Sequence, residues 1–331
     1  DTHGRRMRVP SIGWQALLAG RDRFRYGARF TLDHHAMTEP LFERLTVVGL
    51  GLIGSSIARR ARGDSGIARE VVAYDADPAV RARVAELGIV HRVAPTEAEA
   101  VQDADCVVLC VPVGAMGAVA AALLPHMKPG AILSDVGSTK QSVIREIGPL
   151  LPPGIAFVPA HPLAGTEYSG PDSGFSTLFE GRWTLLTPIE GGDPEATARV
   201  ARLWQLCGAM TREMDAAHHD RVLAIVSHLP HLLAFTICGT ADDLEGESRS
   251  EVLQFAASGF RDFTRIAASD PTMWRDVFLN NRDALLEMLA RFTEDAQAMA
   301  RAIRWGDEDF IVDRIERGRR IRRSLIEIKQ A

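Results

Sequence analysis

The chain has 331 residues, 46% hydrophobic and 24% charged, which is ordinary for a soluble globular protein with room for two packed domains. The net charge of -5 offers no general attraction for nucleic acid, so an anionic substrate needs a locally basic site. The four cysteines form no C-x-x-C pair and no zinc-finger cluster, which favours a reducing cytoplasm.

The first 36 residues are rich in arginine, and the stretch from Ile12 to Leu18 is too short and mixed for the apolar part of a signal sequence. We therefore expect residues 1–44 to be an N-terminal extension that is poorly ordered up to residue 36, with a basic targeting arm as the alternative. No apolar run reaches the ~18 to 20 residues that cross a bilayer, so we expect a cytoplasmic protein without a membrane partner.

Short apolar runs alternate with helical segments from Leu45 to Leu206. The predicted strands are 45–50, 71–74, 90–93, 106–111, 132–136, 155–159 and 183–187, and the predicted helices are 52–62, 78–87, 115–124, 140–150 and 194–206. Continuous apolar strands joined by helices are typical of a parallel sheet that is covered on both faces. The pattern therefore predicts an α/β fold, with a Rossmann-type, mainly parallel domain over residues 45–215.

Only helical periodicity follows Asp215, over 218–240, 249–258, 271–303 and 307–329. We therefore predict that residues 216–331 form an all-helical domain for substrate binding and dimerisation. Its helices carry long apolar faces, for example from Val222 to Leu233, which exceed what the edge of one small domain needs to bury. Because closed two-fold symmetry is the commonest assembly, we expect a homodimer.

A glycine-rich motif lies between the first predicted strand and the first predicted helix. It reads Gly49-Leu50-Gly51-Leu52-Ile53-Gly54, and the strand–turn–helix context gives this GxGxxG pattern its weight. Gly49 permits the tight turn, Gly51 lets a diphosphate approach the backbone, and Gly54 lets helix and strand pack closely. The backbone N–H groups at Leu52 and Ile53, at the positive end of the helix dipole, would then hold the diphosphate.

Asp75 ends the second predicted strand, 21 residues after Gly54. An acidic residue at about this distance bonds the ribose hydroxyls of a dinucleotide. Because its carboxylate would repel a 2′-phosphate, the predicted cofactor is NAD and not NADP. A flavin site, a nucleotide-sugar site or an inactive Rossmann fold is the alternative.

Ligands of open α/β sheets bind beyond the carboxyl ends of the strands, and three predicted strands end in suggestive residues. Val111 and Pro112 are apolar and suited to packing a nicotinamide ring. Ser138 follows the strand 132–136 and His161 follows the strand 155–159, so we expect these two side chains to lie close together.

Four motifs, taken in order, resemble those of the prephenate and arogenate dehydrogenase family. They are DVGSTK at 135–140, AHPLAGTEYSG at 160–170, SHLPH at 227–231 and GFRDFTRIAASDPTMWRD at 259–276. The resemblance covers residues 45–276. It implies an NAD-dependent oxidoreductase of tyrosine biosynthesis that oxidises and decarboxylates prephenate, arogenate or both, to 4-hydroxyphenylpyruvate or tyrosine.

That reaction needs a base at the ring hydroxyl, and His161 is the best candidate because a usual pKa of ~6.5 leaves it mostly neutral. A structural histidine ahead of Pro162 is the alternative. Ser138 is expected to orient the imidazole or contact the nicotinamide, and also to serve as N-cap of the helix that begins at Thr139.

Arg265 is the carboxylate clamp that the resemblance implies, since a guanidinium suits bidentate capture of a carboxylate. A surface ion pair is the alternative. Glu167 and Asp262 are expected to pair with Arg265 and gate the pocket. Thr166, next to Glu167 in its motif, is also assigned to the substrate site.

His228 and His231 are three residues apart and share one helix face. At least one of them is expected to bind the side-chain end of the substrate. A metal pair is the alternative, but no third ligand of matching spacing accompanies them, so we predict no metal.

Two other functions compete with this one. The β-hydroxyacid dehydrogenase family is similar in outline but uses a lysine of the helical half as proton carrier, and Lys329 is the only lysine here after Lys140. An NAD-binding sensor or scaffold without enzymatic activity is the second alternative, and the polar residues clustered at strand ends favour an enzyme over it. The sequence does not separate prephenate from arogenate as substrate.

Overall fold

The computed structural model describes residues 39–166, 168–244, 251 and 254–327. In this part of the chain, six parallel strands form one sheet in the order β3-β2-β1-β4-β5-β6. They are β1 (Phe42–Val48), β2 (Ala68–Tyr74), β3 (Arg92–Val93), β4 (Cys106–Leu109), β5 (Ile132–Asp135) and β6 (Ala156–Val158). The strand order reverses between β1 and β4, so the carboxyl ends of these strands form the crevice where doubly wound sheets bind ligands.

Helices cover both faces of this sheet, as continuous apolar strands require. One face packs against α2 (Leu52–Arg62) and α7 (Pro194–Leu206), with Ile57 and Trp204 in its buried core. The other face packs against α5 (Met116–Leu123) and α6 (Gln141–Ile147), which contribute Met116 and Val143. The helix α3 (Pro78–Leu87) connects β2 to β3, and α4 (Glu97–Val101) connects β3 to β4.

A second, smaller sheet holds β7 (Ala160–Pro162), β8 (Trp183–Leu186) and β9 (Met210–Glu213) in that order. β7 runs antiparallel to β8, and β9 runs parallel to it. The sequence predicted a strand at β8 but not at β7 or β9, because a three-residue strand with proline and a largely exposed strand leave no apolar run. His161 therefore lies within a strand and not after one.

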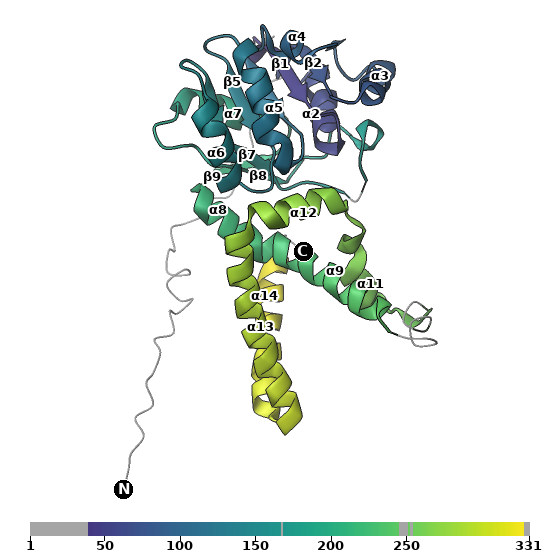
Figure 1. The fold of residues 1–331 in the computed structure, drawn as a ribbon. Helices are drawn as coiled ribbons and strands as arrows, with labels where there is room; N and C mark the ends of the chain where they lie inside the picture. Colours follow the sequence, from purple (N-terminus) through teal and green to yellow (C-terminus); the bar gives the residue numbers. More distant parts are fainter. Residues whose placement is uncertain (1–38, 167, 245–250, 252–253, 328–331) are drawn as a thin grey trace. The chain divides into compact units, whose positions relative to one another are not determined.

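The chain after β9 has helices and no strand among the described residues. The helices are α8 (Ala216–Leu223), α9 (Leu229–Asp242), α11 (Ser258–Thr264), α12 (Pro271–Asn280), α13 (Arg282–Trp305) and α14 (Glu308–Glu327), with short segments η5 (Ala224–His228) and η6 (Arg265–Ala268). The π-helical segment η5 joins α8 to α9, in whose first turn Pro230 lacks a backbone N–H. α13 and α14 run side by side (Figure 1).

The predicted fold class, a Rossmann-type domain followed by helices, is confirmed. Several boundaries differ from the prediction; β2 begins at Ala68 and not at Val71, and the helix α4 was not predicted. β1 begins at Phe42 and not at Leu45, and Phe42 is buried beneath the guanidinium of Arg199. The single helix predicted over 271–303 is two helices, because Asn281 leaves helical geometry with φ -115° and ψ 34°. The predicted lack of order up to residue 36 lies outside the described residues.

One helical stretch is long and apolar enough to cross a membrane, by length and composition alone. It spans Ala216–Asp242; its most apolar 18-residue window has a mean hydropathy of 1.8, and 28% of that window is buried. The expectation that no such run exists is therefore wrong. The stretch also carries His219, Asp220 and His228, which are buried in polar contacts with other segments of the fold. These contacts indicate a helix of the globular fold rather than a span.

Candidate active site

The GxGxxG turn requires glycine at two positions. Gly49 has φ 92°, and a Cβ there would lie 2.7 Å from the carbonyl oxygen of Cys110. A Cβ on Gly54 would lie 1.9 Å from the carbonyl oxygen of Gly49. Gly51 instead has open space where its Cβ would be, at the start of α2, which has no side-chain cap. Open space beside uncapped helical N–H groups has the chemistry of a diphosphate site.

The carboxylate of Asp75 lies beside this turn, just past the carboxyl end of β2. It accepts hydrogen bonds from the backbone N–H of Leu50, at 2.8 Å, and of Asp77, at 3.0 Å. Val111 lies across the turn, with its Cγ1 3.0 Å from where a Cβ on Gly49 would be, and Pro112 next to it is exposed. The structure thus brings the glycine turn, Asp75 and Val111 together at the carboxyl ends of the strands.

His161 lies where the Rossmann-type domain meets the helical region that follows β9. It lies in β7, opposite Leu185 of β8, and is 8% exposed. Its Nδ1 lies 2.9 Å from Nε2 of His219 on α8. On the other side, the buried ammonium group of Lys140 donates to the carbonyl oxygen of Ala160 at 2.8 Å and forms an ion pair with Asp135.

The surroundings of His161 suit a base. Burial lowers the pKa of His161 well below its usual value, because the charged ring loses its hydration. Positive charge on His219, Lys140 or His228 lowers this pKa further. The ring is therefore neutral at about pH 7 and keeps a lone pair for a proton, as general-base catalysis requires.

Asp220 of α8 caps the amino end of α6. Its carboxylate oxygens accept hydrogen bonds from the backbone N–H of Lys140, at 2.7 Å, and of Gln141, at 2.9 Å. The prediction that Ser138 is the N-cap is therefore wrong, because α6 begins at Gln141 and a carboxylate from a distant segment fills the capping role. Ser138 is partly buried two residues before Lys140, and its contact with substrate or cofactor stays a prediction.

The polar network continues to His228. The side-chain amide of Asn281 donates to the carbonyl oxygen of Asp220 at 2.8 Å and lies 2.9 Å from Nδ1 of His228. Burial lowers the pKa of His228 to about 4. Its Nε2 is buried and has no hydrogen-bond partner among the described residues. The predicted contact between His228 and substrate stays a prediction.

His231 and Arg265, both predicted to bind substrate, share one neighbourhood. The His231 ring stacks on Trp274 with 3.7 Å between centroids, and its Nδ1 lies 2.9 Å from the carbonyl oxygen of Ser227. Burial lowers the pKa of His231, and the charge of Arg265 acts in the same direction although the bond to Ser227 opposes it.

The remaining predicted substrate residues are less enclosed. Arg265, Asp262 and Thr166 are exposed, and Thr166 accepts a hydrogen bond from the backbone N–H of Tyr168 at 3.3 Å. Glu167 lies outside the described residues, so the predicted gate that it forms with Arg265 stays a prediction.

Helix α12 joins the two groups of predicted residues. It packs against η1 (Val113–Ala115), the segment that follows β4. The approach is close, since a Cβ on Gly114 would lie 2.7 Å from Oδ2 of Asp276 on α12. Trp274, in the same helix, is thereby placed on the carboxyl side of the sheet, where the glycine turn and His161 also lie.

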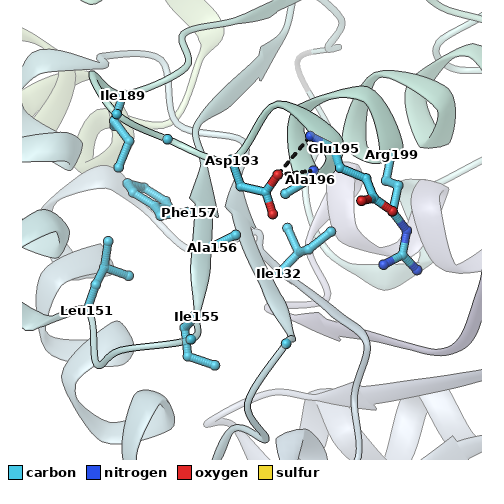
Figure 2. Close-up of a pocket in the computed structure, with 14 residues that line it drawn as sticks. Ile132, Leu151, Ile155, Ala156, Phe157, Ile189, Asp193, Glu195, Ala196 and Arg199 are labelled. Carbon is cyan, nitrogen blue, oxygen red and sulfur yellow. Dashed lines mark hydrogen bonds between the residues drawn. The ribbon is translucent and has the colours of Figure 1, made fainter.

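A cavity of about 460 Å³ lies at the other end of the strands, near their amino ends (Figure 2). Ile132 and Ala156 line it from the amino ends of β5 and β6, and Asp193 lines it from the start of α7. The Asp193 carboxylate already accepts hydrogen bonds from the backbone N–H of Glu195 and Ala196. Because α/β sheets bind ligands at the carboxyl ends of their strands, this cavity is not the candidate active site.

Three residues that surround the candidate base and His228 were not predicted from the sequence: His219, Asp220 and Asn281. The available signal was the run His218-His219-Asp220 at the start of the first helix after β9. In the described ranges, no cluster of three or more His, Cys, Asp and Glu side chains is arranged to hold a metal ion.

Comparison with known families places this site in context. Residues 57–213 match the family model described as prephenate dehydrogenase, nucleotide-binding domain, and residues 215–317 match the one described as prephenate dehydrogenase, dimerization domain. The chain belongs to the prephenate dehydrogenase family. The resemblance found in the sequence motifs is thereby confirmed.

Two curated relatives from the family align with most of this chain. The cyclohexadienyl dehydrogenase of Zymomonas mobilis is 41% identical over 285 residues, which cover 86% of this chain and 97% of the relative. The prephenate dehydrogenase of Bacillus subtilis is 34% identical over 254 residues, which cover 76% and 67%.

Solved structures of the family have the same fold. The prephenate dehydrogenase from Aquifex aeolicus, in complex with hydroxyphenyl propionate and NAD+, aligns with a TM-score of 0.80 at 30% identity and covers 86% of this chain and 98% of its own. The arogenate dehydrogenase from Synechocystis aligns with a TM-score of 0.72 at 26% identity and covers 85% and 99%.

Proposed function

We propose that the chain oxidises and decarboxylates a cyclohexadienyl acid, prephenate, arogenate or both, with NAD+ as hydride acceptor. The observation that carries the proposal is a buried, neutral His161 that lies, like the open glycine turn, on the carboxyl side of the parallel sheet. Membership of the prephenate dehydrogenase family and the relatives that act on prephenate or arogenate support it. Tyrosine biosynthesis is the route that such products serve.

The turn fits NAD+ on its own geometry. Open space in front of Gly51 leaves room for a diphosphate, while Gly49 and Gly54 have none to spare. The carboxylate of Asp75 is the kind of group that bonds the ribose hydroxyls, and its charge disfavours the extra phosphate of NADP. An NAD+ complex is known for the A. aeolicus relative, which supports the same cofactor here.

The residues of the chain would divide the reaction between them. Bound NAD+ supplies the chemistry of hydride acceptance from the hydroxyl-bearing ring carbon. His161 takes the hydroxyl proton as the carbon–hydrogen bond breaks, so the ring gains a carbonyl group. Arg265 binds the ring carboxylate. Loss of that group as carbon dioxide leaves its electron pair in the ring, negative charge moves onto the carbonyl oxygen, and a proton returned from His161 completes the phenol. Burial of His161 excludes water from the developing charge.

The experiment is formation of NADH by the purified chain with NAD+ and either prephenate or arogenate. We expect rapid, substrate-dependent NADH formation with at least one of the two acids. A β-hydroxyacid without a cyclohexadienyl ring serves as control and should give none. NADH formed only with the β-hydroxyacid would support the competing dehydrogenase family, and none with any acid would support a non-enzymatic role.

We also propose that two copies of the chain form a homodimer through the helical region. Match to a dimerization domain supports this, as do large apolar side chains on the surface of α12, α13 and α14. They include Leu279, Leu286, Ile303, Trp305, Val312 and Ile315, and Trp305 is 80% exposed. Sedimentation at micromolar concentration tests the proposal, which a monomer would contradict.

The cytoplasm is the compartment that we propose for the protein. All four cysteines are free in the structure, and burial raises the pKa of the Cys106 and Cys207 thiols to about 12, which keeps both thiols protonated. Free thiols suit a reducing compartment. Fractionation of the source cells tests the assignment, and recovery of the protein with membranes would contradict it.

A further inference from the structure

The candidate base His161 is the first of three buried side chains that contact one another in sequence. His161 and His219 are 2.9 Å apart at Nδ1 and Nε2, and their rings meet edge to face at 62°. The other ring nitrogen of His219, Nδ1, lies 2.8 Å from Oδ1 of Asp220. His219 and Asp220 are 0% and 1% exposed, so water does not compete for these contacts.

The carboxylate of Asp220, the last of these three side chains, accepts hydrogen bonds and donates none. The Asp220 carboxylate receives the backbone N–H groups of Lys140 and Gln141, which can only donate. Burial alone would raise the pKa of Asp220, but the hydrogen bonds from His219 and from these two backbone groups outweigh it, and the pKa is lowered. Asp220 is therefore ionised, and His219 must donate to it through Nδ1.

The direction of the next hydrogen bond follows. Burial lowers the pKa of His219 and outweighs the hydrogen bond to Asp220, so the ring is neutral and carries one proton. That proton is on Nδ1, which leaves Nε2 of His219 as an acceptor. His161 must then donate through its own Nδ1, and its Nε2 is left with the lone pair.

We propose that His219 and Asp220 are positioning residues that hold His161 in the Nδ1–H tautomer, so that Nε2 is the atom that accepts the substrate proton. The inference rests on the proposed function, in which His161 is the base. The alternative tautomer would carry its proton on Nε2 and could not accept another there. When Nε2 takes the hydroxyl proton, the positive charge on His161 is balanced through His219 by the Asp220 carboxylate.

Two variants of His219 separate hydrogen bonding from packing. His219→Leu fills space but accepts no hydrogen bond, whereas His219→Gln offers an amide oxygen to His161 Nδ1. With prephenate, we expect His219→Leu to lower kcat by at least about tenfold. The loss should not exceed the ~10²- to 10⁴-fold effect that is typical of removing the general base itself. His219→Gln should recover part of that loss. The KM for NAD+ should change little in either variant.

His218→Asn is the matched control, because His218 is the neighbouring histidine and is exposed. It should keep the kcat of the unaltered chain. If His219→Leu folds and also keeps that kcat, or if His219→Gln is no better than His219→Leu, the positioning role is wrong.

A second measurement does not depend on activity. Nitrogen-15 NMR of the histidine rings in the unaltered chain distinguishes a protonated Nδ1 from a protonated Nε2, with His161→Asn used to assign the signal. We expect the hydrogen of His161 on Nδ1. A signal from the Nε2–H tautomer overturns the proposal, even if the His219 variants do not fold. If prephenate is not a substrate, the same spectrum still decides the tautomer, so this failure and that of the proposed function are distinguishable.

Discussion

The carboxylate of Asp220 on α8 accepts the backbone N–H of Lys140 at 2.7 Å, although the two residues are 80 positions apart. A helix of the second half of the chain thereby caps a helix of the first half. The same aspartate contacts His219, which contacts His161. The position of the candidate base therefore depends on how the two halves of the chain pack.

Replacing Asp220 should lower both stability and activity. Loss of an N-cap carboxylate costs about 0.5 to 2 kcal/mol, and Asp220→Ala should cost at least this much because buried N–H groups lose their partner. Urea unfolding and kcat with prephenate measure the two effects. Asp193→Ala is the matched control, since Asp193 caps α7 away from His161 and should lower stability alone. Equal kcat in the two variants would contradict the account.

Removing the base should act on the chemical step. For His161→Asn we expect kcat to fall by ~10² to 10⁴ while the KM for prephenate changes little. His126→Asn, at an exposed histidine distant in sequence from the site motifs, is the control and should leave kcat unaltered. A His161 variant with normal kcat would remove this residue from the mechanism.

Asp75 should determine the choice of cofactor. Its carboxylate is predicted to bond the ribose hydroxyls and to repel a 2′-phosphate, so the chain should prefer NAD+ to NADP+. Asp75→Ser should shift the ratio of kcat/KM for the two cofactors toward NADP+ by at least about tenfold, or 1.4 kcal/mol. It should also weaken NAD+ binding, because Leu50 loses its hydrogen-bond partner. Asp77→Ser removes a nearby charge and should leave the ratio alone; an unaltered chain that runs better on NADP+ would refute the assignment.

Arg265 should bind substrate and not cofactor. A hydrogen bond to a charged group contributes about 1.5 to 3 kcal/mol, so Arg265→Ala, at a side chain that is exposed here, should lower kcat/KM for prephenate by about 10- to 10²-fold. The loss should appear mainly in KM if the carboxylate is bound equally before and during hydride transfer. Arg265→Lys should recover only part, because an ammonium lacks the planar fork.

Arg261→Ala is the control for Arg265, since both arginines are exposed in the same motif. It should change kcat/KM for prephenate much less. If Arg265→Ala weakens NAD+ binding and leaves the KM for prephenate as it was, the substrate site lies elsewhere.

Acid should destabilise the fold through its buried histidines. Burial lowers the pKa of His228 from 6.5 to about 4 in the folded chain, so between these values the unfolded chain binds more protons. The stability present above pH 6.5 is therefore lost as the pH falls toward about 4, by about 3 kcal/mol for this residue. Urea unfolding at several pH values measures it. His228→Gln should flatten the dependence, and an unchanged slope would show that His228 is not buried neutral.

The sequence predicted those features that local patterns carry. Apolar strands, glycines and an acidic strand end predicted the Rossmann-type domain, and His161 and Arg265 were proposed through motifs that resemble those of the family. The contact between His161 and His219 joins residues 58 positions apart, and no local pattern encodes it. The cap of α6 was misassigned to Ser138 for the same reason, since a nearby serine is the usual cap and a distant carboxylate leaves no trace in the sequence around it.

The central claim is that one reaction couples hydride transfer to decarboxylation at this site. The direct test is to convert a limiting amount of prephenate with excess NAD+ and to quantify NADH, carbon dioxide and 4-hydroxyphenylpyruvate together. We expect equal amounts of all three, formed about 10² to 10⁴ times more slowly by His161→Asn. Carbon dioxide and an aromatic product without NADH, or NADH without carbon dioxide, would contradict it.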